Sequence, residues 1–121
     1  NTLLPAETEL LKYTDAPSGS KKIVAYLMNH LDEMTDLEKM AEELMMSKSH
    51  LIRQCKEMTG YTVQTLHEML KIEQAKNLLH IDGMKLSDIA SRLGFQNQSY
   101  FSAVFKKNTG MSPKNWIQRN R

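Results

Sequence analysis

The chain has 121 residues, of which 40% are hydrophobic and 25% are charged, and its net charge is +2. This length suits one domain or two very small lobes, and the composition is ordinary for a soluble globular protein. Composition argues against a membrane protein, because no apolar run approaches the roughly 18–20 residues of a membrane span, and no signal-peptide pattern opens the chain. The single cysteine, Cys55, excludes an internal disulfide and fits a reducing cytoplasm.

Charge is distributed unevenly along the chain. Residues 1–43 carry four basic and nine acidic side chains, a net charge of −5, whereas residues 44–121 carry twelve basic and five acidic ones, a net charge of +7. Such a split indicates an anionic partner for the basic part, but an unevenly charged solvated surface explains it equally well. Because the first residue is Asn1 rather than Met, we expect the chain to be a piece of a longer protein.

The first predicted elements are a tail and a helix. Residues 1–20 end in "DAPSGS", the composition of a flexible linker, and the preceding "LLPAETELLKY" is expected to be the helical tail of an upstream domain. The stretch "KKIVAYLMNHLDEM" then places Ile23, Leu27 and Leu31 at helical spacing.

Two short helices are expected next. Thr35 and Glu38 form a capping-box pattern, which predicts a helix with one apolar face made of Leu37, Met40, Ala41 and Leu44. Ser47 is the predicted N-cap of the following helix, on which Leu51, Cys55 and Met58 align. Thr59 and Gly60 end that helix.

A longer helix over about residues 63–80 is predicted after Thr62, with Leu66, Leu70 and Ala75 facing inward. It is followed by helices over residues 86–93 and 98–108, and Ser112 with Pro113 begins the last one. The predicted fold class is therefore all-α, with seven helices.

Residues 36–62 and 85–112 form an internal repeat. Leu37, Ala41 and Leu44 match residues 49 positions later, Leu86, Ala90 and Leu93. Ser49, Lys56, Thr59 and Gly60 match residues 50 positions later, so the second copy has one inserted residue. A small Ala allows two helices to cross closely. Each copy is thus predicted to be a helix-turn-helix, a motif whose second helix can enter the major groove of DNA.

The second helix of each copy carries an exposed stripe suited to base edges. In the second copy Phe101, Val104 and Phe105 face the core, and the opposite stripe contains the predicted base-contacting residues Gln98, Ser99, Ser102 and Ala103. In the first copy the predicted base contacts are Ser49, Ile52 and Arg53. Gln can pair with adenine, Arg with guanine, and Ile can pack on a thymine methyl group. Any exposed helix face is polar, however, so either stripe alone is weak evidence.

The stretch "IASRLGFQNQSYFSAVFKKNTGMSPKNW" resembles the second helix-turn-helix of the AraC/XylS family of bacterial transcription regulators, and "LKIEQAKNLL" resembles the connecting helix of that family. The resemblance covers about residues 21–121. It implies two homeodomain-like helix-turn-helix subdomains, over residues 36–58 and 86–108, joined by a connecting helix over residues 63–80. The first copy departs from the family at three positions. Met45 replaces the usual turn glycine, Cys55 replaces the usual Phe, and Val63 replaces the usual Pro.

The resemblance also implies a function: a DNA-binding domain that reads two adjacent major-groove segments and activates transcription in the bacterial cytoplasm, at the nucleoid. A connecting helix of about 18 residues spans about 27 Å and would hold the two recognition helices in groove segments about 34 Å apart. Double-stranded DNA is the expected partner, and a missing N-terminal regulatory domain and RNA polymerase are further candidate partners. The residues expected to contact phosphates are Ser47, Lys48, Lys56, Asn97, Lys106, Lys107 and Lys114.

Other chemistry finds little support in the sequence. His30, His50, His67 and His80 are scattered without cysteine partners, so no metal site, cofactor or catalytic residue is expected. Cys55 is predicted to be a packed thiol, and most of the nine methionines core fillers. Two alternatives remain open: a helical protein-interaction module, and the DNA-targeting part of a larger DNA-modifying enzyme.

Overall fold

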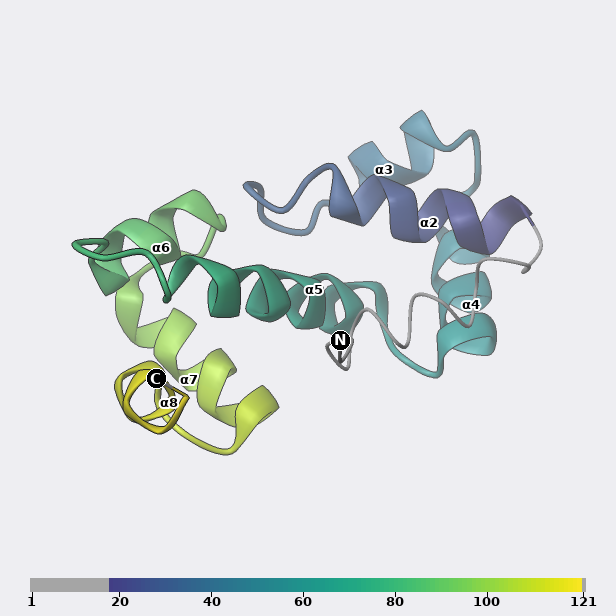
Figure 1. The fold of residues 1–121 in the computed structure, drawn as a ribbon. Helices are drawn as coiled ribbons and strands as arrows, with labels where there is room; N and C mark the ends of the chain where they lie inside the picture. The colour runs from purple at the N-terminus through teal and green to yellow at the C-terminus, as the bar shows by residue number, and fades with distance from the viewer. Residues whose placement is uncertain (1–17, 121) are drawn as a thin grey trace. The chain divides into compact units, whose positions relative to one another are not determined.

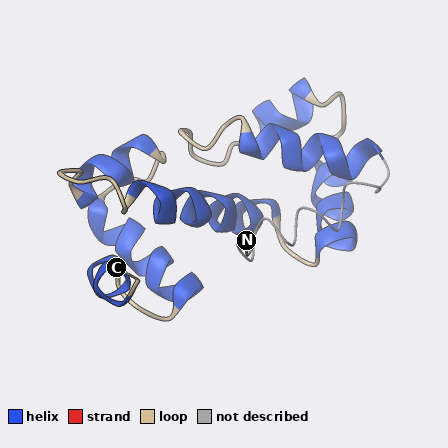
Figure 2. Ribbon diagram, viewed as in Figure 1, coloured by secondary structure: helices blue, strands red, loops and turns tan. Residues whose placement is uncertain are grey.

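The computed structural model describes residues 18–120, which form helices joined by loops and turns (Figure 1). No strand occurs among these residues (Figure 2), and none of their helices is long and apolar enough to cross a membrane. The seven helices are α2 (Ser18–Met28), α3 (Leu37–Glu43), α4 (Lys48–Thr59), α5 (Val63–Leu78), α6 (Leu86–Arg92), α7 (Gln98–Thr109) and α8 (Pro113–Arg119). The all-α prediction with seven helices is confirmed for this part of the chain, and the tail expected upstream lies outside the described residues.

The chain folds into two compact units. The first contains the described residues up to His30 together with Thr35–Leu70, and the second contains Leu31–Met34 together with the chain from Lys71 onward. The N-terminal half of α5 therefore belongs to the first unit and its C-terminal half to the second. This division explains why buried residues occur on several sides of α5, since the helix supplies core residues to both units.

The core of the first unit is mostly aliphatic. Helix α4 packs against both α2 and α3. On α2 and α4 the buried residues lie four positions apart, which places them on one face of each helix. The buried hydrophobic residues are Ile23, Leu27, Met40, Ala41, Leu51, Cys55, Val63, Leu66 and Leu70.

Aromatic rings dominate the core of the second unit. Phe101 and Phe105 are both fully buried on α7, with ring centroids 5.9 Å apart, and Trp116 of α8 lies edge-on to Phe105 at 6.0 Å. Phe95 packs 5.3 Å from Phe101. Such tilted and edge-on ring pairs add to the free energy gained by burying the same surface. The aliphatic part of this core comprises Ile72, Ala75, Leu79, Ile89, Ala90, Leu93 and Val104.

The internal repeat predicted from the sequence is present in the structure. Helices α3 and α6 each have seven residues and begin 49 positions apart, whereas α4 and α7 each have twelve and begin 50 positions apart. The turns match as well: the Met46 amide donates to Ala41 O and the Phe95 amide to Ala90 O, both at 2.9 Å. Met45 and Gly94, which occupy the equivalent turn position, both have positive φ angles, of 56° and 70°.

Helices α4 and α7 end in the same way. Gly60 and Gly110 are left-handed C-caps whose amides donate to Lys56 O and Lys106 O. Just before each glycine, the hydroxyl of Thr59 or Thr109 donates to a carbonyl one turn earlier, at 2.7 and 2.8 Å. The two copies thus share capping chemistry as well as helix length, as the Thr-Gly pairs in the sequence indicated.

Two local predictions were wrong. The N-cap of α3 is Asp36, whose side chain accepts from the Lys39 amide at 3.1 Å, rather than Thr35. The Thr35 hydroxyl instead lies 2.7 Å from Nδ1 of the buried His67. The first helix also ends earlier than expected, at Met28, and Leu31 packs against the core of the second unit instead of continuing the helical stripe.

Candidate nucleic-acid interface

The first candidate surface lies on α4, opposite its buried residues Leu51 and Cys55. All three predicted base-contacting residues of this helix, Ser49, Ile52 and Arg53, are exposed. Ile52 is 43% exposed, so its aliphatic side chain is accessible. The α4 stripe, as we call these three residues, therefore combines a hydroxyl, an aliphatic group and a guanidinium on one accessible face.

The second candidate surface lies on α7, opposite the buried Phe101, Val104 and Phe105. Of the four predicted base-contacting residues, Gln98, Ser99 and Ala103 are exposed, whereas Ser102 is half-buried. These four residues form the α7 stripe. Its side chains are small apart from Gln98, so the helix backbone can approach another surface closely, and Gln98 supplies both an amide donor and an amide acceptor.

The N-terminus of each recognition helix is capped by a side chain predicted to contact phosphate. Ser47 Oγ accepts from the His50 amide at 3.0 Å, and Asn97 Oδ1 accepts from the Tyr100 amide at 2.8 Å. Each cap satisfies one of the amides that have no partner within the helix. The remaining first-turn amides and the positive end of the helix dipole still favour an anion at these two sites.

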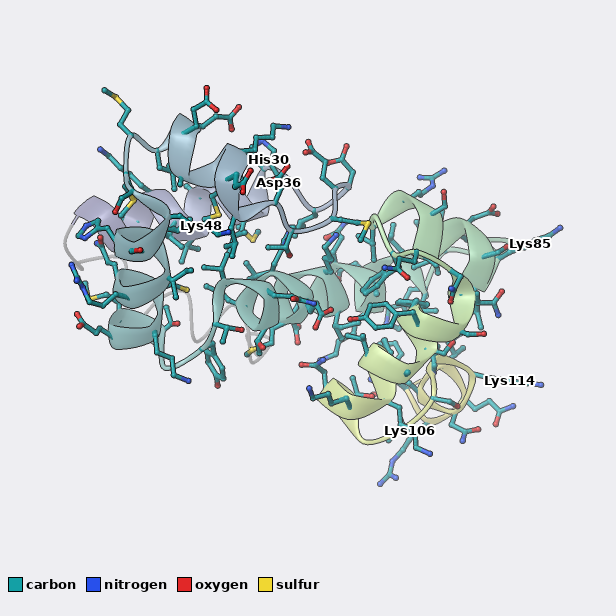
Figure 3. The ribbon with its side chains drawn as sticks, turned by 180° about the vertical axis from the view of Figure 1, so that it is seen from behind. His30, Asp36, Lys48, Lys85, Lys106 and Lys114 are labelled. Atoms are coloured by element: carbon teal, nitrogen blue, oxygen red, sulfur yellow. The ribbon has the colours of Figure 1, made fainter. Side chains whose placement is uncertain are left out.

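The predicted phosphate-contacting lysines are all exposed but differ in their local partners. Lys48 lies 3.9 Å from Glu38, and Lys56 donates to Gly60 O at 3.0 Å. The side chains of Lys106 and Lys114 extend away from the ribbon (Figure 3), and Lys107 is also exposed. An exposed lysine contact contributes little to stability, so these side chains can change partners at low cost.

The turn before α4 holds a strained residue. Met45 has a φ of 56° and is 93% exposed, so its side chain gains little from packing. A left-handed conformation costs a residue with a Cβ about 1–2 kcal/mol. The turn of the second unit avoids this cost because Gly94 occupies the equivalent position.

No group of three or more His, Cys, Asp or Glu side chains within the described part of the chain is placed to hold a metal ion. Cys55 is fully buried, and its thiol lies 3.5 Å from Tyr61 O. Burial raises the pKa of the Cys55 thiol, and the opposing effects of Thr59 and the Lys56 charge are smaller. A neutral, enclosed thiol is a poor nucleophile.

The sequence did not single out four further residues: His50 on α4, Tyr100 on α7, and the buried His67 and Lys71 on α5. Arg53 donates to Nδ1 of His50 at 3.2 Å, and the i, i+3 spacing of the pair on α4 was a usable signal. Tyr100, which lies between Ser99 and Ser102 in the sequence, is 39% exposed. His67 and Lys71 are buried on α5, and neither of them was assigned a role from the sequence. Their burial depends on contacts with residues more than 20 positions away, which local patterns do not reveal.

Comparison with known proteins gives a consistent result. A family model described as a helix-turn-helix domain matches residues 40–119. The HTH-type transcriptional activator RhaR of Enterobacter sp. (strain 638) is 34% identical over 114 residues, which are 89% of this chain and 40% of the relative. The chain thus spans well under half of the length of such curated relatives, which are regulators rather than enzymes.

Solved structures are similar too. The C-terminal domain of AraT, a response regulator from Geobacillus stearothermophilus, superposes with a TM-score of 0.78 at 32% identity and 87% coverage of each chain. The DNA-binding domain of AdpA, a global transcriptional factor solved in complex with a target DNA, gives a TM-score of 0.77 at 25% identity, covering 85% of this chain and 93% of that one.

Proposed function

Because the chain belongs to the AraC/XylS family of DNA-binding transcription regulators, we propose that it reads a specific DNA sequence by placing α4 and α7 in two adjacent segments of the major groove. The observation that carries this proposal is the repeat. The same helix, turn and twelve-residue second helix occur twice, and each second helix has an accessible stripe opposite its buried face. A helix-turn-helix presents its second helix to DNA in this manner.

Each stripe has a distinct expected preference. Arg53 supplies two donors to the O6 and N7 acceptors of guanine, and Ile52 packs on a thymine methyl group, with Ser49 alongside. Gln98 pairs with adenine, while Ser99, Ser102 and Ala103 let the backbone of α7 approach the bases. The two halves of the site should therefore differ in sequence, which makes the whole site asymmetric.

Backbone contacts supply the register of the complex on DNA. The capped N-termini of α4 and α7, at Ser47 and Asn97, are the proposed phosphate sites, together with the exposed lysines Lys48, Lys56, Lys106, Lys107 and Lys114. The net charge of +7 over residues 44–121 supports this placement.

The whole protein is proposed to be a larger transcription activator. Its DNA-binding domain would occupy residues 21–121, and a regulatory domain would lie upstream, in line with the greater length of the RhaR relatives. Activation is proposed to involve contact with RNA polymerase. A protein that acts on the bacterial chromosome would reside in the cytoplasm at the nucleoid.

Selection of binding sites from random duplex DNA tests the proposal. We expect a site with two blocks about one helical turn apart, and an affinity that falls steeply with salt concentration. The variant Arg53→Ala should relax the preference in one block only and Gln98→Ala in the other, each by roughly 1–3 kcal/mol. Arg92→Ala and Gln64→Ala remove the same side-chain types from exposed positions outside the stripes and should preserve both preferences.

A protein-interaction module would give a different outcome. The folded domain would then select no consensus site, and its weak binding to DNA would not change in either stripe variant. A single-block site with equal effects of both substitutions would also contradict the proposed use of two recognition helices.

A further inference from the structure

Lys71 is a buried lysine in the half of α5 that belongs to the second unit. Its side chain is only 3% exposed, whereas lysines are rarely buried unless their charge is compensated. The ammonium group donates to three backbone carbonyls, Leu31 O at 3.1 Å, Glu33 O and Leu93 O. It also lies 5.4 Å from the centre of the Phe95 ring. Three carbonyls match the three N–H donors of an ammonium group.

These contacts join two segments that are far apart in the sequence. Leu31 and Glu33 belong to the segment Leu31–Met34, which is part of the second unit although it precedes α3. Leu93 and Phe95 belong to the turn between α6 and α7. Lys71 therefore holds Leu31–Met34 against the turn that leads into the proposed recognition helix.

Gly94 shows how closely the two segments approach. A Cβ atom at this position would lie 2.8 Å from Asp32 O and from the carbonyl carbon of Glu33, too close for any side chain. Gly110, the C-cap of α7, also has a positive φ, but a Cβ atom built there would have no neighbour within 4 Å. The glycine in the turn is thus required by its neighbour as well as by its φ of 70°.

The turn determines where α7 begins. Gly94 and Phe95 donate their amides back to Ser91 O and Ala90 O, and Asn97 caps α7 two residues after Phe95. A shift of this turn is transmitted directly to Gln98 and Ser99. Recognition of base edges requires side chains held to within about 0.5 Å.

We propose that Lys71 is a positioning residue for DNA recognition: by fixing Leu31–Met34 on the Leu93–Gly94 turn, it sets the position and direction of α7. This proposal rests on the proposed function, because it assigns α7 to one block of the DNA site. The first unit has no equivalent arrangement at its own turn, where Met45 is 93% exposed. The effect is therefore specific to the block read by α7.

The test compares Lys71→Met with Lys85→Met. Both variants lose one positive charge, but Lys85 is exposed and belongs to neither stripe nor the proposed phosphate contacts. The block read by α7 is first identified as the one whose preference relaxes in Gln98→Ala. In the unaltered domain a mismatch in either block should weaken binding by roughly 5- to 150-fold. Lys71→Met should lower this discrimination to about twofold or less in the α7 block only, and Lys85→Met should retain it in both blocks.

Further measurements separate positioning from loss of the fold. Trp116 is the only tryptophan of the chain and packs in the second unit, so its fluorescence reports whether that unit is folded at the assay temperature. Lys71→Arg keeps donors for the carbonyls and should retain most of the discrimination. Where Lys71→Met unfolds the unit, a pair of glycine variants decides: Gly94→Ala should lose discrimination in the α7 block, whereas Gly110→Ala, which bears similar backbone strain, should not.

The proposal would be overturned if Lys71→Met folded and kept its full discrimination in the α7 block. If Lys71→Met unfolds, the proposal would be overturned by equal discrimination of Gly94→Ala and Gly110→Ala in that block. Failure of the unaltered domain to select any DNA site would instead refute the proposed function, so the two failures are distinguishable.

Discussion

The two units build the same helix-turn-helix from different core residues. At equivalent positions of the recognition helices, the first unit has Leu51 and Cys55 where the second has Phe101 and Phe105, all four of them fully buried. Rings from Phe95 and Trp116 complete the second core. The comparison shows that the topology depends on which positions are apolar, whereas the packing energy depends on the volume of the side chains there.

The turns that precede α4 and α7 also differ between the two units. The second turn has a glycine, and the segment Leu31–Met34 is packed against it, whereas the first turn has the strained and exposed Met45. We therefore expect the first unit to be the less stable of the two. A less stable recognition unit opens more often, so the α4 stripe should be held less firmly than the α7 stripe.

The largest expected effect comes from giving the second core the cysteine of the first. Phe105→Cys leaves a cavity between Phe101 and Trp116, and it should lower the free energy of unfolding of the second unit by roughly 2–4 kcal/mol, slightly less than truncation of a Phe to Ala. Urea unfolding followed by the fluorescence of Trp116 measures this loss. Ser91→Cys adds a cysteine at an exposed position and should leave the transition unchanged. A loss below about 1 kcal/mol for Phe105→Cys would contradict the packing argument.

Local signals explain how much of this fold the sequence predicted. The repeat, the end of the first recognition helix at Gly60 and the cap at Ser47 were predicted correctly, because each depends on neighbouring residues. At the start of α3 both Thr35 and Asp36 are good caps, and only the distant His67, which bonds to Thr35, decides between them. The exposed stripes were located by helical periodicity, and their contacts with DNA stay predictions.

Burial of polar groups was the main point that the sequence did not reveal. Lys71 and His67 are enclosed because carbonyls of residues 30, 31 and 33 need donors. No pattern within α5 encodes this requirement, since it arises from a loop more than 30 positions earlier in the chain. Leu31, whose carbonyl accepts from Lys71, likewise lies beyond the end of α2 at Met28.

The second prediction removes the strain from the first turn. Met45→Gly should stabilise the first unit by about 1 kcal/mol, because glycine adopts a φ of 56° without a Cβ clash and little packing is lost from a side chain that is 93% exposed. Amide hydrogen exchange of α4 measures this gain in the first unit alone. At the neighbouring Met46, which is half-buried and has no positive φ, substitution by glycine should destabilise the unit instead. Faster exchange in Met45→Gly would show that the turn is not strained.

A third, smaller effect distinguishes the equivalent lysines Lys56 and Lys106. Lys106→Ala should weaken DNA binding uniformly across sequences and reduce the slope of log K against log salt concentration by about 0.9, the value for one lost phosphate contact. Lys56→Ala should change the slope less, since this ammonium group bonds to Gly60 O in the free domain, and should destabilise the first unit by about 0.5 kcal/mol or less. Equal slopes for both variants would remove this difference between the units.

The smallest effect is a pH dependence confined to the first unit, which contains Cys55. Burial raises the pKa of this thiol in the folded state, so the folded domain keeps a proton that the unfolded chain releases at about pH 8.5. Because the unfolded state binds fewer protons in that range, stability is fully present below pH 8.5 and falls as the pH rises through the folded pKa. Exchange of the α4 amides between pH 8 and 10 measures the decline after correction for the intrinsic exchange rate. Cys55→Ser does not titrate there and should show a shallower decline. Equal slopes would mean that the thiol has the same pKa in both states.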